Sequence, residues 1–397
     1  MLGTAASKKR KPQRTDGIGS KNKLKKTALK LFSENSFVDV SISQITRLSK
    51  LSTGAFYQYY VNKDEIFREI VDDFFRNFDK DVNGNNLREV TISFANYCTK
   101  NSLMTKALYL NEYSFEWIRN EFDAHLLKLS KKFGLSYVEH FYFWAPLRFC
   151  VFFGDLLEIK INYDELFEII LEGIGKDCPN ELPANIFSFV PERRMISTDE
   201  RREQILSNAE SLFGTYGFNK TQVYDIARST GIAIGTVYLY FENKKEILHE
   251  LVRIISKGLR YNVKLSLEKL GKQHRLVEEI AGLYAFVQFF RIHSNMYKIV
   301  RESQSIDHAI AKEYYRSLYD SYVAALKKAL EKGEIKDFNL SYIALMMMSY
   351  GHYAGERYIL SGRIGDQNSE RLEEFLKELY SYLCKGLEGK ECYSTAR

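Results

Sequence analysis

Two short segments of the chain carry side chains suited to reading the edges of DNA bases. A glutamine amide such as that of Gln58 can pair with adenine through two hydrogen bonds, and apolar side chains such as Ile234 and Leu239 can contact the methyl group of thymine. The candidate DNA-binding residues are Ser52, Thr53, Gly54, Ala55, Tyr57 and Gln58 in one segment and Ala233, Ile234, Gly235, Thr236, Tyr238 and Leu239 in the other.

The sequence shows no clear pattern of catalytic or metal-binding residues. No combination of nucleophile, base and orienting group stands out, and no phosphate loop, so we expect no enzyme and no cofactor. His352 and Glu356 are four residues apart and could reach one metal ion, but without a third ligand packing or hydrogen bonding is favoured. The cysteines show no paired spacing, which fits a reducing compartment and argues against structural zinc; they are Cys98, Cys150, Cys178, Cys384 and Cys392.

The two segments belong to a longer repeat, in which many residues of the first copy recur at an offset of 181 positions. The identical residues are Ala28, Leu31, Phe32, Phe37, Ile45, Arg47, Gly54, Tyr57, Tyr59, Asn62, Lys63, Glu65 and Ile66, which recur as Ala209, Leu212, Phe213, Phe218, Ile226, Arg228, Gly235, Tyr238, Tyr240, Asn243, Lys244, Glu246 and Ile247. Such an offset is too long for a solenoid repeat and suits a whole domain. We therefore expect two complete protomers in tandem.

Each copy is predicted to form four helices. In the first helix of the first copy, apolar residues recur at helical spacing on one face, from Leu24 to Phe32. Ser41 can cap the second helix, and a three- or four-residue turn leads into the third. Two short helices across a tight turn form a helix-turn-helix, whose second helix is slim enough to enter the major groove of DNA.

The two predicted helix-turn-helix segments resemble a known family of DNA-binding domains. The stretch TQVYDIARSTGIAIGTVYLYFENKKEIL (Thr221 to Leu248) closely resembles the DNA-binding domain of the tetracycline-repressor (TetR) family, and SISQITRLSKLSTGAFYQYYVNKDEIF (Ser41 to Phe67) resembles it less cleanly. The first copy departs from the pattern where Ser36 replaces Gly217, Lys50 replaces Gly231 and Val40 replaces Thr221.

This resemblance implies roles for several residues. The glycine of the third helix allows close approach to the duplex, the tyrosine and the lysine reach phosphates, and hydroxyl groups add further contacts. The residues so implied are Gly54, Tyr57, Lys63 and Ser41 in the first copy and Gly235, Tyr238, Lys244 and Thr221 in the second.

Charge is concentrated at the start of the chain. The 57 basic and 51 acidic residues give a net charge of +6, yet residues 1–30 alone hold ten Lys or Arg against Asp16. We expect a disordered basic arm over residues 1–20, which either contacts phosphates and the minor groove or is a solvated tail. Nothing resembles a signal peptide or a membrane span, so the prediction is a cytoplasmic protein without a membrane partner.

The expected fold class is all-α, with two TetR-like units, each a helix-turn-helix head and a helical body. Three of the five prolines lie in the linker between the units, and no sustained β alternation appears. The expected boundaries are 21–71 for the first head, 72–175 for its body, 176–197 for the linker, 198–252 for the second head and 253–390 for its body.

In the family resembled, the last two helices of each body form a four-helix bundle with a partner subunit. Here the corresponding pairs are residues 137–159 with 163–175, and 340–360 with 369–387, which are apolar on a broad face. We expect the two halves to pack on each other as a pseudo-dimer within one chain. Ordinary packing inside each body would use the same residues.

The bodies are rich in aromatic residues, with 27 Phe and 27 Tyr over the chain. In the second body they could line a pocket for a flat or greasy molecule, although aromatic stripes more often form core. The candidate ligand-binding residues are Phe286, Phe290, His293, Tyr297, Tyr319, Met347, Tyr350 and Arg357.

The sequence therefore favours a sequence-specific transcriptional regulator, a repressor released from its DNA operator by a small hydrophobic or aromatic effector. The alternative is an interaction protein that keeps this fold but has lost specific DNA binding, which the apolar second recognition helix permits. We expect a monomeric pseudo-dimer, and a homodimer stays open as the alternative.

Overall fold

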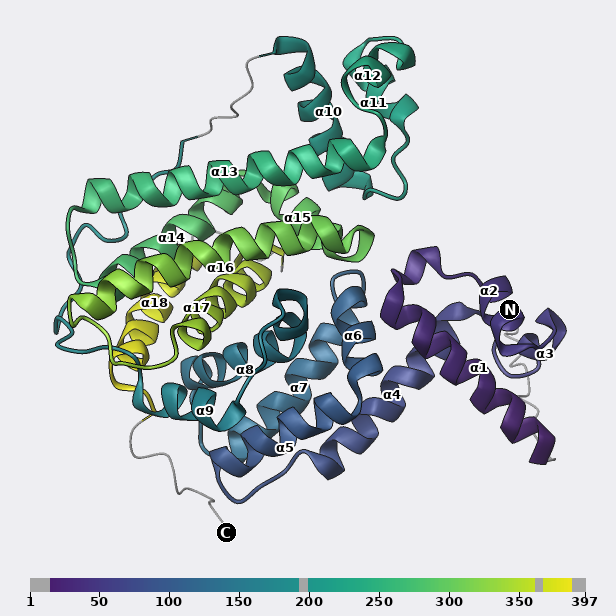
Figure 1. Ribbon diagram of the computed structural model, residues 1–397, viewed down its shortest axis with the longest axis horizontal. Coiled ribbons are helices and arrows are strands. Elements are labelled where there is room, and N and C mark those ends of the chain that lie inside the picture. Colours follow the sequence, from purple (N-terminus) through teal and green to yellow (C-terminus); the bar gives the residue numbers. More distant parts are fainter. Residues whose placement is uncertain (1–14, 193–198, 361–366, 388–397) are drawn as a thin grey trace, which may run out of the picture. The chain divides into compact units, whose positions relative to one another are not determined.

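The computed structural model describes residues 15–192, 199–360 and 367–387 (Figure 1). Within these residues the secondary structure is helical, apart from one isolated antiparallel bridge between Gly175 and Ile335. The prediction of an all-α fold is confirmed.

The chain divides into two compact units. The N-terminal unit comprises residues 15–83 and 96–125, and the main unit comprises residues 84–95 and everything described after residue 125. The main unit therefore contains the second repeat and also the last helices of the first.

The N-terminal unit contains the first head and part of the first body. Its elements are α1 (Thr15–Glu34), the 3-10 turn η1 (Phe37–Asp39), α2 (Ile42–Ser49), α3 (Thr53–Tyr57), α4 (Lys63–Asp81), the end of α5 (Leu87–Lys100), α6 (Ser102–Asn111) and the start of α7 (Glu116–Lys132). Residues 15–20, which we assigned to the basic arm, belong to α1 instead. The rest of that arm lies outside the described residues.

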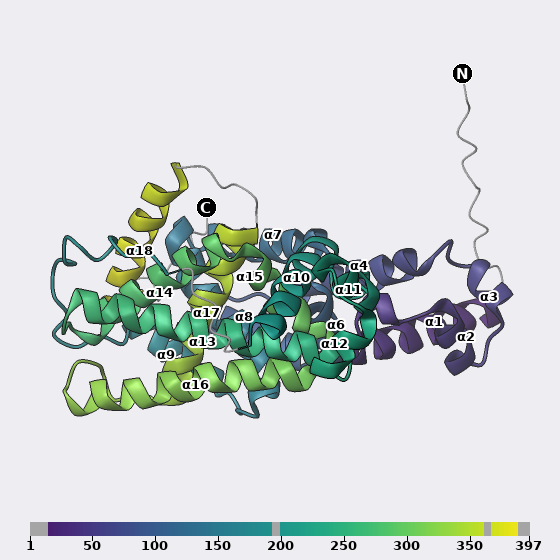
Figure 2. The same cartoon turned by 90° about the horizontal axis from the view of Figure 1, so that it is seen from above.

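The main unit holds the remaining helices. They are α8 (Tyr137–Leu157), α9 (Tyr163–Glu172), α10 (Glu200–Tyr216), α11 (Val223–Thr230), α12 (Ile234–Tyr240), α13 (Lys244–Leu270), α14 (Arg275–Ile292), α15 (Ser294–Ile306), α16 (His308–Glu331), α17 (Leu340–Gly355), its π-helical extension η2 (Glu356–Leu360) and α18 (Gln367–Lys385). The long helices α13 and α16 run alongside each other in both views (Figure 2).

The repeated residues explain why the two heads fold alike. In each head, the apolar positions of the repeat form a core that solvent does not reach: Leu24, Ala28, Phe32, Ile45, Phe56 and Ile66 in the first, and Ile205, Ala209, Phe213, Ile226, Val237 and Ile247 in the second. The repeated asparagine caps the fourth helix, because Asn62 Oδ1 accepts from Glu65 N at 2.9 Å and Asn243 Oδ1 accepts from Glu246 N at 3.0 Å.

The main unit contains the interface between the two repeats. Helix α8 of the first repeat packs against α17 and α18 of the second (Figure 1). The Tyr350 hydroxyl donates to Tyr142 O at 3.1 Å, and Phe141 packs edge-on against Phe375 with ring centroids 4.9 Å apart. The predicted pseudo-dimer within one chain is therefore confirmed.

The second head is seated on its own body through α10 and α15. A Cβ atom at Gly214 of α10 would lie 2.4 Å from the side chain of Asn295 in α15, so only glycine permits this approach. Helix α15 in turn packs against α13 and α16, which places it between the head and the interior of the body.

Candidate functional site

The first helix-turn-helix is built by two caps and a left-handed turn. Ser41 and Gln44 form a capping box at the start of α2, and Ser52 Oγ accepts from Ala55 N at 3.1 Å to start α3. Lys50 ends α2 in the left-handed region with φ 54°, where an L-residue is strained. Phe56 is fully buried and anchors α3 on the head.

The opposite face of α3 is turned to solvent. Ser52, Thr53, Gly54 and Gln58 are exposed, Ala55 is half-buried, and Tyr57 is 56% exposed. Every candidate on this helix is therefore accessible to a partner. That the partner is DNA stays a prediction for the individual residues.

The second helix-turn-helix has the same frame and a more apolar outer face. Gly231 ends α11 with φ 71°, and Val237 is the buried anchor of α12. On the outer face, Tyr238 is 50% exposed and Leu239 is 83% exposed. Ala233, Ile234 and Gly235 are also exposed, and Thr236 is half-buried.

The glycines on the two outer faces are not required by the heads themselves. Neither Gly54 nor Gly235 has positive φ; a Cβ at Gly54 would meet only Ser52 Oγ at 3.8 Å, and one at Gly235 would meet nothing within 4 Å. Glycine inside a helix costs roughly 0.5–1 kcal/mol relative to alanine. The fold of each head therefore gives no reason for glycine at these two positions.

The repeated lysines are turned inward, which the sequence did not predict. Lys63 Nζ donates to Phe37 O and to Val40 O, the latter at 2.6 Å, and lies 4.2 Å from the centroid of the Phe37 ring. Lys244 Nζ donates to Phe218 O at 2.8 Å and to Thr221 O at 2.7 Å. Burial lowers the pKa of Lys63. These ammonium groups fasten the fourth helix to the loop after the first, and their phosphate contact stays a prediction without structural support.

The prediction for Thr221 needs correction. Its side chain is only 2% exposed, and the hydroxyl donates to Gly217 O at 3.0 Å. A buried hydroxyl already used inside the head is not placed to contact DNA. Ser41, in contrast, is exposed at the start of α2.

Other cations are better placed for phosphates. Arg47 and Lys50 in the first head and Arg228 and Lys220 in the second are exposed, and none of them forms an ion pair with a described residue. Arg47 and Arg228 occupy the same position of the repeat, so the recurrence was the signal that could have identified them.

The second body contains a cavity of about 750 Å³, lined by residues of α13, α14, α15, α16 and α17. Its walls are mostly apolar and include Leu259, Val263, Leu267, Leu283, Phe286, Val300, Leu318 and Met348. The size and the lining are those of a pocket for a small organic molecule.

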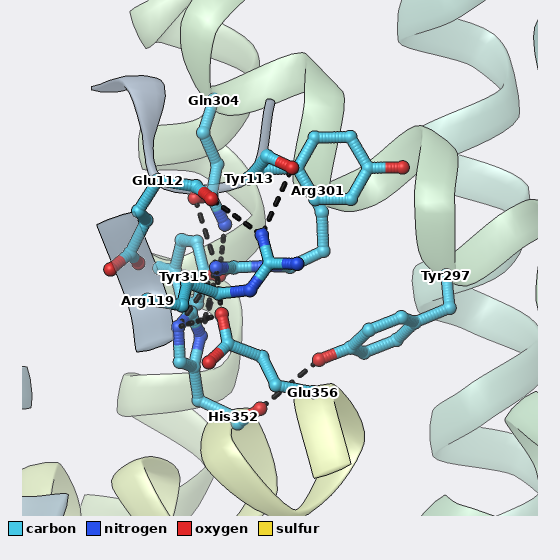
Figure 3. A network of polar contacts seen from close by, with 9 residues as sticks. All are labelled: Glu112, Tyr113, Arg119, Tyr297, Arg301, Gln304, Tyr315, His352 and Glu356. Carbon is cyan, nitrogen blue, oxygen red and sulfur yellow. Dashed lines mark hydrogen bonds and ion pairs between the residues drawn. The ribbon is translucent and has the colours of Figure 1, made fainter. Parts of the chain in front are cut away.

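One end of the cavity is polar, and Arg301 forms its centre (Figure 3). This side chain is 2% exposed; it donates to the ring of His352, with Nη1 2.8 Å from Nε2, and to Gln304 Oε1 at 3.2 Å, and it pairs with Glu356. Burial and the nearby arginine charge hold the pKa of His352 well below its usual range, so the ring is neutral. Tyr297 closes this end by donating to His352 O at 3.0 Å.

Only two of the predicted ligand residues, Phe286 and Tyr297, lie on this cavity. Tyr350 faces α8 at the interface between the repeats, Tyr319 donates to Ser341 Oγ at 2.7 Å, and Arg357 lies over the Tyr137 ring at 4.0 Å. Phe290, His293 and Met347 do not line the cavity either. These six side chains do not line this cavity, because an apolar stripe does not distinguish a cavity wall from a packed interface, and their contact with a ligand stays a prediction.

Helix α15 connects the cavity with the second head. Tyr297, Val300 and Arg301 face the cavity, and the next residue, Glu302, accepts a hydrogen bond from Phe218 N of the head with both carboxylate oxygens, at 3.0 and 2.9 Å. A displacement of α15 at the cavity would therefore act directly on the turn that follows α10.

No helix among the described residues is both long and apolar enough to cross a membrane.

Comparison with known proteins identifies both heads. The family model described as bacterial regulatory proteins of the tetR family matches residues 24–70 and again residues 205–251.

Relatives of known sequence are transcriptional regulators. The chain is similar to the HTH-type transcriptional regulator YvdT of Bacillus subtilis, with 24% identity over 195 residues, which cover 48% of this chain and 96% of YvdT. It is also similar to YhgD of the same organism, with 25% identity over 134 residues, 34% of this chain and 69% of YhgD.

Among solved structures, the chain is similar to the fatty acid degradation regulator FadR of Bacillus halodurans, with 17% identity and a TM-score of 0.40, over 49% of this chain and 98% of that protein. The 195 residues matched by YvdT make up nearly the whole of that protein and about half of this chain. The family model matches at the two places where the heads fold, so this chain carries two helix-turn-helix domains of the tetR type in tandem.

Proposed function

We propose that the chain is a transcriptional repressor that holds one DNA operator with both heads and releases it when a small, largely apolar molecule enters the cavity of the second body. The proposal rests above all on the glycines of the third helices. Gly54 and Gly235 are exposed, cost the head stability and have no internal purpose, whereas a helix lying in a DNA groove needs such close approach.

The route from cavity to head supports release by a ligand. A molecule that binds best when α15 is displaced would shift the protein toward that arrangement. Because Glu302 holds the Phe218 amide, the displacement would loosen or tilt the second head. The ligand would thus lower the affinity for DNA without touching the DNA-binding surface.

Fluorescence anisotropy with the DNA upstream of the protein's own coding sequence tests the proposal. A Gly54→Leu/Gly235→Leu variant is expected to keep the fold, because a Cβ at either position makes no close contact with its head, and to lose DNA binding. Gly19→Leu, at another exposed helical glycine without neighbours within 4 Å, is the matched control. Unchanged DNA binding by the double variant would contradict the proposed docking of the third helices.

One observation favours a second candidate function. The outer face of α12 exposes Leu239 and Ile234, the latter 42% exposed, where a DNA-reading helix usually carries polar side chains. An interaction protein would use this face to contact another protein. In that case the wild-type chain would show no preference between its upstream DNA and a scrambled duplex of the same length.

We also infer that one chain covers one operator. The interface between repeats lies inside the chain, and the two third helices differ in sequence, so the operator halves should differ as well. Light scattering is expected to give a monomer, and titration one chain per duplex. A stable dimer with four heads would contradict this stoichiometry.

A further inference from the structure

The cavity contains an arginine whose charge no protein carboxylate balances. Arg260 Nη1 donates to Ser256 Oγ at 2.8 Å and to Ser317 Oγ at 2.6 Å, and no described residue forms an ion pair with it. Its side chain lines the cavity and is half-buried. A cation held by hydroxyl groups alone beside an apolar space is a receptor for an anion.

The other cations of the cavity are already neutralised or lie in solvent. Arg275 pairs with Glu278 at 3.4 Å and with Glu279, and Lys264 pairs with Glu268 at 3.5 Å. Arg301 pairs with Glu356 at the far end. Lys272 has no ion pair but is exposed, so water screens its charge.

Two tyrosine hydroxyls extend the anion receptor. Tyr314 and Tyr322 line the cavity, and their hydroxyls have no hydrogen-bond partner among the described residues. Burial raises the pKa of Tyr314, so its hydroxyl keeps the proton and can donate it in a hydrogen bond. Along α16, eight residues separate these tyrosines, which corresponds to about 12 Å at the rise of an α-helix.

We propose that the effector is an amphipathic carboxylate, with its anionic group on Arg260 and a linear or flat apolar body along the α16 wall. This inference rests on the proposed effector role of the cavity and adds the chemical class of the ligand. The apolar walls would hold the body by burial, and the arginine would select the anionic head because a neutral or cationic head leaves its charge unbalanced.

Calorimetric titration of the full chain without DNA tests the ligand class with three probes of equal tail: decanoate, decanol and decyltrimethylammonium. Decanoate is expected to bind about tenfold more tightly than decanol, and the cation least tightly. Arg260→Gln is expected to reduce decanoate affinity to that of decanol and to leave decanol affinity unchanged. Lys264→Gln, one turn further along the same helix, is the matched control and should keep the preference.

Equal affinity for the three probes, or a preference for decanoate that survives Arg260→Gln, would overturn the proposal. A thermal unfolding curve like that of the wild type shows that each variant is folded. The role of the cavity as an effector site fails separately: decanoate would then bind without releasing DNA. Release by decanol but not by decanoate would contradict the ligand class and keep the effector role.

A second inference comes from two thiols far apart in sequence. Cys178 in the linker and Cys384 near the end of α18 lie beside each other, and the neighbouring Cys384 side chain lowers the pKa of Cys178. A Cβ at Gly175 would lie 2.2 Å from Cys178 Sγ and 3.0 Å from Cys384 Cα, so both cysteines converge on one glycine. Both are half-buried.

The backbone around the two thiols is held in place. Ile174 N and Gly175 N donate to Leu383 O at 2.8 and 3.1 Å, and the Tyr380 hydroxyl donates to Pro179 O at 2.8 Å. These hydrogen bonds keep the segment around Cys178 next to the end of α18.

We infer that Cys178 and Cys384 form a reversible disulfide under peroxide stress. The Cys178 thiolate attacks one oxygen of hydrogen peroxide, the O–O bond breaks, and the departing hydroxide takes a proton to become water. The Cys384 sulfur then displaces the second oxygen as water and forms the S–S bond. Two thiols are oxidised and one peroxide is reduced to two waters.

Mass spectrometry of the peroxide-treated full chain tests this pair in a Cys392→Ser background, because Cys392 lies outside the described residues. A linked peptide pair containing Cys178 and Cys384 is expected, reversed by dithiothreitol and absent in Cys178→Ser. The buried Cys98 and Cys150, whose thiol pKa values burial raises, should stay reduced. Oxidation of Cys178 to sulfinic acid without linkage to Cys384 would overturn the inference.

Discussion

The two heads share one core but are fastened to their bodies by different chemistry. In the first, the Phe37 amide donates to Asn111 Oδ1 at 2.7 Å, and the Asn111 amide donates to Phe32 O at 3.2 Å. In the second, the Phe218 amide donates to the carboxylate of Glu302. An asparagine holds the turn as donor and acceptor and has no charge to lose, whereas a glutamate only accepts and can be protonated.

This difference separates two tasks that a symmetric dimer must perform twice. Glu302, whose carboxylate holds the second head, directly follows Arg301, which lines the cavity. In the first head, the contact with the body is made by the uncharged side chain of Asn111, and α3 is more polar than α12. We infer that the first head mainly reads sequence and that the second head mainly responds to the ligand.

The largest expected effect concerns what the heads have in common. Lys63→Met or Lys244→Met should each destabilise the protein by about 2–4 kcal/mol, because two buried carbonyl oxygens lose a charged donor. Urea unfolding followed by circular dichroism measures the loss.

The salt dependence of DNA binding distinguishes this role from phosphate contact. Arg47→Ala or Arg228→Ala should make the slope of log affinity against log salt shallower by about 1 and leave stability unchanged. A shallower slope for Lys63→Met with normal stability would instead restore the phosphate role.

The contacts that Asn111 and Glu302 make with the two heads should respond differently to substitution and to pH. Glu302→Ala should destabilise the protein by about 1–3 kcal/mol through the orphaned Phe218 amide. Burial raises the pKa of Glu302, with the Phe218 amide and Lys244 opposing, so its folded value lies above the unfolded one. This contribution to stability is therefore complete below the unfolded pKa and is lost as the pH rises through the folded one.

In Glu302→Gln, the pH dependence that Glu302 contributes to the free energy of unfolding should be absent. Asn111→Asp is the reciprocal change and should introduce a dependence in the first head that the wild type lacks. If the free energy of unfolding depends on pH identically in the wild type and in Glu302→Gln, the proposed difference between the Asn111 and Glu302 contacts is contradicted.

Sequence reading should differ between the heads. Gln58→Ala is expected to relax the base preference at one half of the operator by about 1–3 kcal/mol. Leu239→Ala is the counterpart in α12 and should affect the other half only. Selection of binding sites from random duplexes measures both, and an equal effect of Gln58→Ala on both halves would contradict one chain per operator.

A smaller effect is expected for the glycines of the third helices. Gly54→Ala and Gly235→Ala should each raise the free energy of unfolding by about 0.5–1 kcal/mol while weakening DNA binding. Opposite signs for stability and binding would be the mark of a functional glycine. A gain in stability with no loss of binding would assign the glycine no role at the DNA.

The smallest effect concerns the turn of the helix-turn-helix. Lys50 has φ 54° where the second head has Gly231. Glycine at position 50 removes about 1–2 kcal/mol of left-handed strain but adds about 0.4–1 kcal/mol of chain entropy in the unfolded state. Lys50→Gly should therefore stabilise the first head by roughly 0.5 kcal/mol, visible as a small rise in the unfolding midpoint.

The heads were predictable because local rules determine them. A cap such as Asn62 and a buried anchor such as Phe56 act within a few residues of their own position, so spacing alone reveals them. The direction of Lys63 was not predictable, because the carbonyl groups it binds are 23 and 26 residues away.

The cavity could be placed in the right body but not on the right residues. Helix α17 is buried nearly all round, so its sequence has no polar face to indicate direction. Met348 faces the cavity, and Tyr350, two residues on, faces α8. Arg260 escaped notice because a charged residue on a helix is usually solvated, and only the fold shows that its neighbours are hydroxyls.

Because α8 meets α17 and α18 within one polypeptide, this interface cannot be diluted apart. A conventional two-subunit regulator must first assemble, so its occupancy at low abundance falls with the square of its concentration. Here the occupancy of the operator would be proportional to the concentration of the chain, even at a few copies per cell. The halves also cannot exchange with those of related proteins, so under the proposed function each head could evolve for its own half of the operator.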